Sequence, residues 1–160
     1  MISQKSSLML SLVTLVSGIS CFSQNTMVLE DSIVLINQKL FYVKGQTTAF
    51  TGIGVLRNGN GVITMKQHYV NGTVSGIHMD FYDNGSKRDS GFYLPRGMED
   101  GKYYEWYEDG AIQTIGNYKE GAEDGTWKGF GEDGKLIYKK EYKDGNIIKD
   151  VEYDSDGKIK

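Results

Sequence analysis

The amino-acid sequence predicts an all-β fold, an elongated antiparallel sheet of successive β-hairpin repeats. The first observation is periodicity, because aligned glycines recur at intervals of 24, 25 and 24 residues, and a fixed period is the signature of a repeat architecture. The second is the frequency of Asn-Gly and Asp-Gly pairs, which favour the positive φ angles of tight hairpin turns. The third is composition: 21 glycines and 11 tyrosines with one proline in 160 residues indicate many strands joined by tight turns.

Residues 1–23 are predicted to be a secretory signal peptide. A short segment carrying Lys5 precedes the apolar run LMLSLVTLVSGI, which is too short to span a bilayer comfortably, and cleavage is expected after Ser23. The protein is therefore expected in the periplasm, in the cell envelope or outside the cell. One alternative is a buried N-terminal helix. The other is cleavage before Cys21 and lipidation of that residue, although Gly18 stands where a lipobox has Leu or a similar residue.

The segment 24–51 is expected to form capping strands and half a repeat. IVLINQ, residues 33–38, is one predicted strand. LFYVKG is the other, because Gly45 follows Tyr42 by three residues, as in the second half of a repeat. Four full repeats are predicted at 52–75, 76–100, 101–124 and 125–148. Residues 149–160 are predicted to form a partial repeat that caps the array, with a polar end that discourages pairing of its edge.

Each predicted repeat consists of a strand, a turn, a second strand and another turn. A glycine opens the repeat, a second glycine follows nine residues later, and a tyrosine follows seventeen residues after the first. The second repeat contains one additional residue at Pro95-Arg96, which is expected to lie in a turn. The repeat glycines are Gly52, Gly61, Gly76, Gly85, Gly101, Gly110, Gly125 and Gly134, and the tyrosines are Tyr69, Tyr93, Tyr118 and Tyr142.

Two aromatic columns run through the first strands of the repeats. In a regular strand, their separation by three residues places them on opposite faces, whereas a glycine-rich bulge would bring them to one face. Packing in the core is the expected role of Phe81, Trp106, Phe130 and Trp127. The alternative is an aromatic stripe that stacks on sugars or enters lipid headgroups. One column holds Phe81, Trp106 and Phe130, and the other holds His78, Tyr103 and Trp127.

The residues that could support chemistry do not predict an enzyme, a cofactor site or a metal site. The two histidines, His68 and His78, fall in strands of different repeats, without a cysteine or acidic residue at a spacing typical of metal ligands, so both are expected on strand surfaces. The glycines do not form a strand–GxGxxG–helix unit. The net charge of −3 and the absence of a basic stripe argue against nucleic acid as a partner.

The repeats resemble the MORN-repeat family in its bacterial variant. The segments GIHMDFYDNGSK, GKYYEWYEDGAI and GTWKGFGEDGKL, with YKEG and YKDG, are similar to its glycine–aromatic–Asn-Gly unit and its closing Y-x-x-G. The resemblance covers Gly45 to about Gly157. It implies a meander of hairpins and a binding role, because relatives are associated with protein scaffolding, with membrane lipids and, in the YwqK-type family, with the antitoxin half of a toxin–antitoxin pair.

The expected function is therefore that of an exported protein that binds another protein, either as an interaction scaffold or as an antitoxin-like immunity factor. Binding of membrane phospholipid is the first alternative, and it depends on clustered lysines. Binding of glycans through aromatic side chains is the second. The residues expected on the interaction surface are Tyr82, Tyr104, Tyr107, Lys139 and Lys140.

Overall fold

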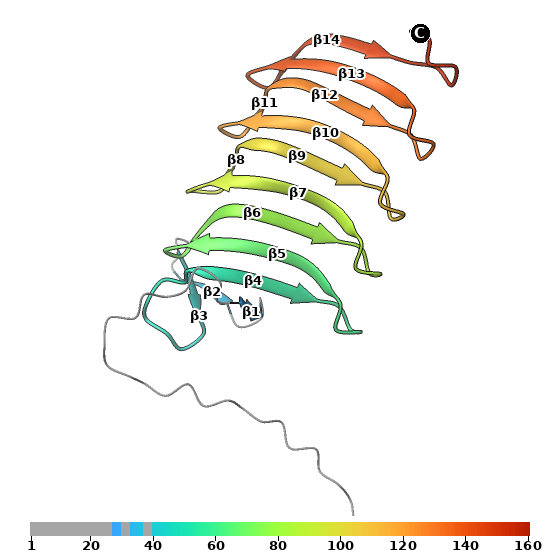
Figure 1. Ribbon diagram of the computed structural model, residues 1–160. Helices are drawn as coiled ribbons and strands as arrows, with labels where there is room; N and C mark the ends of the chain where they lie inside the picture. The colour runs from blue at the N-terminus through green and yellow to red at the C-terminus, as the bar shows by residue number, and fades with distance from the viewer. Residues whose placement is uncertain (1–26, 30–32, 37–39) are drawn as a thin grey trace, which may run out of the picture.

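The computed structural model describes residues 27–29, 33–36 and 40–160, and these residues form an all-β molecule. Its main sheet is a single open layer in the order β1-β4-β5-β6-β7-β9-β10-β12-β13-β14, and the short strands β8 and β11 extend the turns beside β7 and β10. Figure 1 shows the strands rising as a twisted ladder from the N-terminal end to the C-terminal end. The predicted meander of antiparallel hairpins is confirmed. The predicted signal peptide, including Cys21, lies outside the described residues.

The main sheet contains β1 Met27–Leu29, β4 Gly52–Arg57, β5 Ile63–Val70, β6 Thr73–Phe81, β7 Lys87–Leu94, β8 Met98–Glu99, β9 Gly101–Trp106, β10 Ile112–Lys119, β11 Ala122–Glu123, β12 Gly125–Phe130, β13 Leu136–Lys143 and β14 Asn146–Glu152. Neighbouring strands in this sheet pair antiparallel, except for β1, which runs parallel to β4. In the described part of the chain, no helix has the length and apolar character needed to cross a bilayer.

The N-terminal end of the sheet is capped by a separate hairpin of β2 (Ile33–Ile36) and β3 (Leu40–Val43). Ile33 packs with Phe50 and Tyr69 in a small buried cluster, which Phe41 and Val74 extend. The ring of Tyr69 lies 5.0 Å from that of Phe41 and 5.6 Å from that of Phe50, measured between centroids. The first tyrosine of the repeat column is therefore covered by the cap.

The turns at the two long edges of the sheet have different geometries. At one edge, Asn84-Gly85 and its equivalents close four-residue turns, in which only the glycine has positive φ, +87° at Gly85. At the other edge, two-residue turns such as Asn71-Gly72 have positive φ at both residues, +49° and +72°, which matches the twist of the flanking strands. The additional residue of the second repeat lies in the turn that contains Arg96, as predicted.

A β-bulge recurs at the same position of every repeat. The register shifts at the twelfth residue beyond each opening glycine, so that this residue of the second strand has no direct partner. This bulge does not bring the two aromatic columns to one face. Tyr103 stacks on Trp127, whereas its neighbour Tyr104 stacks on Trp106. The bulged residues are Thr64, Arg88, Gln113 and Ile137.

One face of the sheet, here called the tyrosine face, carries a continuous row of rings. Its Trp127, 8% exposed, contacts Tyr103, Tyr118 and Tyr142 at centroid distances of 5.6, 5.1 and 6.0 Å. The Trp127 ring lies over Gly116, where a Cβ atom would overlap it. A glycine leaves room for a large ring to lie flat on the backbone of the sheet, and the neighbouring rings then bury one another. The rings on this face are therefore buried without a second layer of strands or helices.

The opposite face carries the second aromatic column, which is half-buried. Phe81, Trp106 and Phe130 pair across strands with Lys87, Ile112 and Leu136. The ammonium groups of Lys66 and Lys87 lie 5.5 Å from the ring centroids of Phe81 and Trp106. Lysine stems and aromatic rings therefore cover each other on this face.

Candidate functional site

An exposed apolar surface on the opposite face lies over β6, β7 and β9. Ile77 and Phe92 are direct cross-strand partners, 44% and 41% exposed. Tyr104 pairs with Ser90, two residues before Phe92 on β7. We call Ile77, Phe92 and Tyr104 the β6–β9 patch. An apolar centre with aromatic side chains is typical of a protein-binding site.

Tyr104, an expected interaction residue, lies within this patch. Its ring stacks on Trp106 with centroids 5.7 Å apart and an interplanar angle of 18°. The stacking holds the ring in one orientation, so that binding would cost little additional side-chain entropy. Tyr104 is thus placed where a contact surface was expected, and its use in binding stays a prediction.

Tyr82 and Tyr107 have a structural role that the sequence analysis missed. The Tyr82 hydroxyl donates to the backbone carbonyl of Trp106 at 2.7 Å, and the Tyr107 hydroxyl donates to that of Phe130 at 2.8 Å. Each bond joins one repeat to the next. The acceptors lie 24 and 23 residues further along the chain, which is about one repeat length. The repeat period in the sequence could therefore have indicated that these tyrosines contact the next repeat. Their contribution to a binding surface stays a prediction.

Lys139 and Lys140 are neighbours on β13 and point to opposite faces of the sheet. The Lys139 ammonium lies 3.6 Å from a Glu141 carboxylate oxygen on its own face. Lys140 lies 3.3 Å from Asp150, and this contact raises the pKa of the lysine. The structure therefore does not bring the two lysines together, and each has an acidic neighbour. The basic cluster on which lipid binding would depend is divided between two faces.

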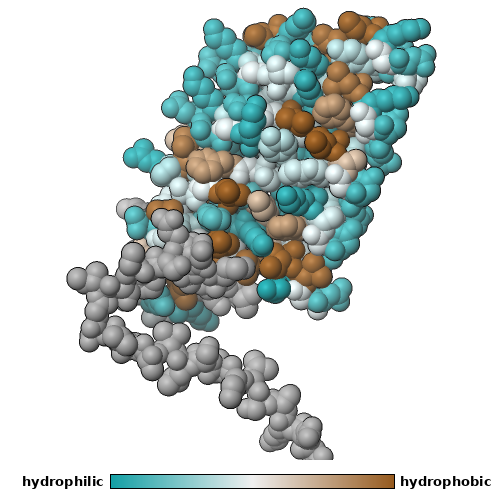
Figure 2. Space-filling view, viewed as in Figure 1, coloured by the Kyte–Doolittle hydropathy of each residue, from teal (hydrophilic) through white to brown (hydrophobic). Residues whose placement is uncertain are grey.

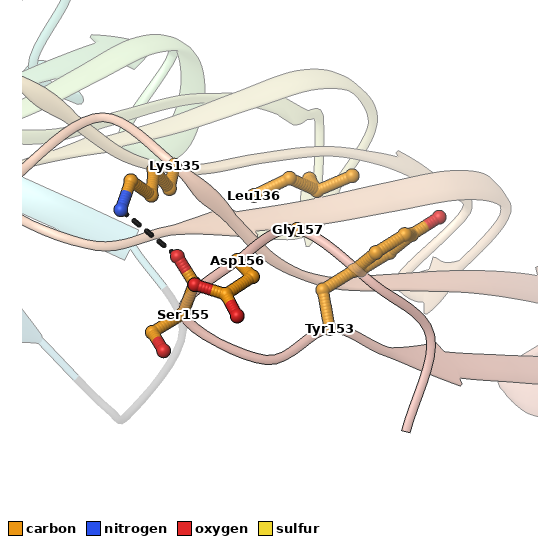
Figure 3. A pocket seen from close by; sticks show the side chains of 6 residues that line it. All are labelled: Lys135, Leu136, Tyr153, Ser155, Asp156 and Gly157. Atoms are coloured by element: carbon orange, nitrogen blue, oxygen red, sulfur yellow. Dashed lines mark hydrogen bonds between the residues drawn. The ribbon is translucent and has the colours of Figure 1, made fainter.

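The hollows on the surface are shallow and lie between strands and turns. One of about 470 Å3 lies at the last turn, where Lys135 donates to the backbone carbonyl of Ser155 at 2.9 Å (Figure 3). Another lies between successive turns and is lined by Tyr82, Tyr107 and Glu132. Figure 2 shows hydrophilic residues along this turn edge, at the right of the view, and apolar residues gathered over the strands. The form of the surface favours contact with an extended partner over enclosure of a small molecule.

The tyrosines of the tyrosine face are shielded from ionisation. Burial, followed by the negative charge of Glu99, raises the pKa of Tyr93 and of Tyr118 to about 12. Burial also raises the pKa of Tyr103. The Tyr93 hydroxyl lies 3.3 Å from Glu99. These shifts follow from packing of the rings against one another and require no catalytic role.

The structure corrects one premise of the sequence analysis, which found no acidic residue at a metal-ligand spacing from either histidine. Asp80 follows His78 by two residues on the same face of β6, and Asp89 lies across from Asp80 on β7. The nitrogen and oxygen atoms of these three side chains that could bind a metal lie within 4.8 Å of one another. Among the described residues, these three form a group that could hold a metal ion.

Comparison with known families supports the repeat assignment. A family model described as the MORN repeat variant matches residues 99–120 and 123–144, which contain the β9–β10 and β12–β13 hairpins. No curated protein matches the chain. The match suggests a repeat-containing binding protein, and the matched repeat family is generally non-catalytic.

Proposed function

We propose that this chain is an exported, non-enzymatic repeat protein that binds another protein, as a scaffold or as an antitoxin-like immunity factor. The observation that carries the proposal is the β6–β9 patch. Ile77 and Phe92 lie side by side on a sheet face that no second layer of described residues covers. The expected partner is a protein with an apolar contact surface, because neither side chain offers a hydrogen bond or a charge.

The partner can be sought by crosslinking, affinity capture of the tagged protein from its native cell envelope, and mass spectrometry. The expected result is one stoichiometric protein that Phe92→Glu no longer captures. Ile148→Glu is the matched control, because Ile148 is 66% exposed in the edge strand β14. Capture of the same protein by the Phe92 variant would contradict the assignment of the patch.

The same experiment separates the finer roles. A captured protein that is toxic to cells lacking this chain supports the immunity role, and a non-toxic partner supports the scaffold role. Lipid recovered without protein would replace the proposal with phospholipid binding. In that case Lys128 and Lys139, direct cross-strand partners, would be the first positions to test.

A further inference from the structure

The group formed by His78, Asp80 and Asp89 lies on the tyrosine face, between the capped end of the sheet and the aromatic row. The side chains of these three residues are 17–19% exposed, so that they are partly shielded and still reachable from solvent. The T-shaped contact of the His78 and Tyr93 rings, with centroids 5.8 Å apart, closes one side of the group.

A buried glutamine fixes the orientation of the histidine ring. Gln67, 6% exposed, has its amide nitrogen 2.9 Å from the backbone carbonyl of His68 and its amide oxygen 2.8 Å from Nδ1 of His78. An amide oxygen only accepts hydrogen bonds, so Nδ1 of His78 must carry the hydrogen. In the form of the ring that binds a metal, in which Nε2 carries no hydrogen, the lone pair of Nε2 faces the carboxylates. A metal-binding histidine is commonly held in this way through its other nitrogen.

An arginine presents the two carboxylates toward that nitrogen. Arg88, the bulged residue of the second repeat, contacts Oδ2 of both Asp80 and Asp89, in the latter case through Nε at 3.2 Å. The Oδ1 atoms of the two carboxylates remain directed at Nε2 of His78, at 3.4 and 3.9 Å.

The distances from Nε2 of His78 to the two carboxylate oxygens are close to those between ligands of one ion. Both N–O distances exceed the range of about 2.7–3.2 Å for a hydrogen bond. With bonds of about 2.0–2.2 Å, tetrahedral Zn²⁺ separates neighbouring nitrogen and oxygen ligands by roughly 3.4 Å. Asp80 already has that distance from His78, and Asp89 requires an approach of roughly half an ångström.

We propose that His78, Asp80 and Asp89 form a binding site for one divalent transition-metal ion of the zinc class. One imidazole and two carboxylates suit this class of ion. With neutral His78, the two carboxylates and Arg88 leave a net charge of −1, which favours a dication. The three protein ligands leave a fourth tetrahedral position open to water or to a side chain of a bound partner. This site goes beyond the proposed function and does not depend on it.

The test is a titration of the purified protein with Zn²⁺ in competition with a chromogenic chelator, repeated with Co²⁺ to observe its visible absorption bands. One ion per chain is expected. His78→Ala should weaken Zn²⁺ binding by roughly 100-fold or more and abolish the Co²⁺ bands, since loss of a supporting group alone costs about 10- to 100-fold. Asp89→Asn should weaken it by roughly tenfold or more.

His68→Ala is the matched control, because it removes the other histidine and leaves the three ligands in place. Zn²⁺ binding by this variant should be unchanged. Circular dichroism establishes that each variant is folded. If His78→Ala does not fold, the ¹⁵N shift of Nε2 in the wild-type protein provides the answer, because Zn²⁺ must move it. An unmoved shift, the absence of saturable binding, or equal binding by His78→Ala overturns the proposal.

Discussion

Substitution of Gly116 by alanine tests whether the glycine backbone allows the aromatic row to form. Gly116 lies in the middle of β10, where its backbone supports the indole of Trp127. The added methyl group would occupy the same space as the ring. Since Trp127 also packs against three tyrosine rings and donates from Nε1 to the Asn117 carbonyl at 3.2 Å, movement of the ring away from Gly116 would break these contacts.

Three contributions to the free energy of unfolding determine the expected loss of stability. Overpacking of a well-packed site costs about 1–3 kcal/mol. Expulsion of the Trp127 ring instead would forfeit the burial of a large apolar side chain, which is worth about 2–3 kcal/mol. Replacement of glycine by alanine restricts the unfolded chain and returns about 0.4–1 kcal/mol. The net expectation for Gly116→Ala is a loss of about 1–2 kcal/mol in the free energy of unfolding.

Urea unfolding measures this loss, with circular dichroism for the sheet and tryptophan fluorescence for the aromatic row. Gly59→Ala is the matched control, because no atom lies within 4 Å of the position of its added Cβ. The control should be unchanged or slightly stabilised, and the emission of the Gly116 variant should shift to the red. Equal stabilities of the two variants, within about 0.5 kcal/mol, would refute the packing argument.

Three further predictions concern bonds, turns and ionisation. Tyr107→Phe should destabilise the protein by about 0.5–1.5 kcal/mol through loss of the hydrogen bond to Phe130. Urea unfolding measures this loss, with Tyr104→Phe as the control because that variant keeps its ring stack. Equal losses of stability in the two variants would contradict the bridging role of Tyr107. Gly85→Ala should lower stability by about 1–2 kcal/mol because its φ of +87° is left-handed, and an unchanged melting temperature would contradict it. Stability should fall as pH rises from about 10 to about 12, because unfolded tyrosine ionises near 10 whereas Tyr118 stays neutral to about 12. Phenolate absorbance at each pH checks the last prediction, and titration of every tyrosine near 10 would contradict it.

The repeat, its turns and its strands could be predicted because they depend on local chemistry. The turn at Asn84-Gly85 follows from residues that tolerate its backbone angles. The assignment of aromatic columns to faces was left open, because it depends on where the register shifts between paired strands. The shift occurs in the second strand, at Arg88 and its equivalents, and no glycine marks it. Pairing across strands, rather than composition, determines this feature.

The candidate sites also combine features that are visible in the local sequence with features that depend on strand pairing. His78 and Asp80 were visible as an i, i+2 pair on one strand face, but Asp89 joins them only through the register of the β6–β7 hairpin. Gly116 carries no signal by itself, since its role appears only when Trp127 of the next hairpin lies over it. The β6–β9 patch likewise depends on the pairing of Ile77 with Phe92. The sequence therefore predicted the hairpins and their order, and it left open the features that depend on strand register and on contacts between repeats.

The bridging hydrogen bonds also determine how the array would respond to a pulling force. At the position equivalent to Tyr82 and Tyr107, the fourth repeat has Gly131, and the exposed Lys135 makes a bond to Ser155 there instead. Tension applied across the ladder loads one hairpin at a time, and each tyrosine bridge is an additional hydrogen bond that must break before the next repeat separates. Each repeat of about 24 residues would then release roughly 80 Å of chain. The protein would extend in steps.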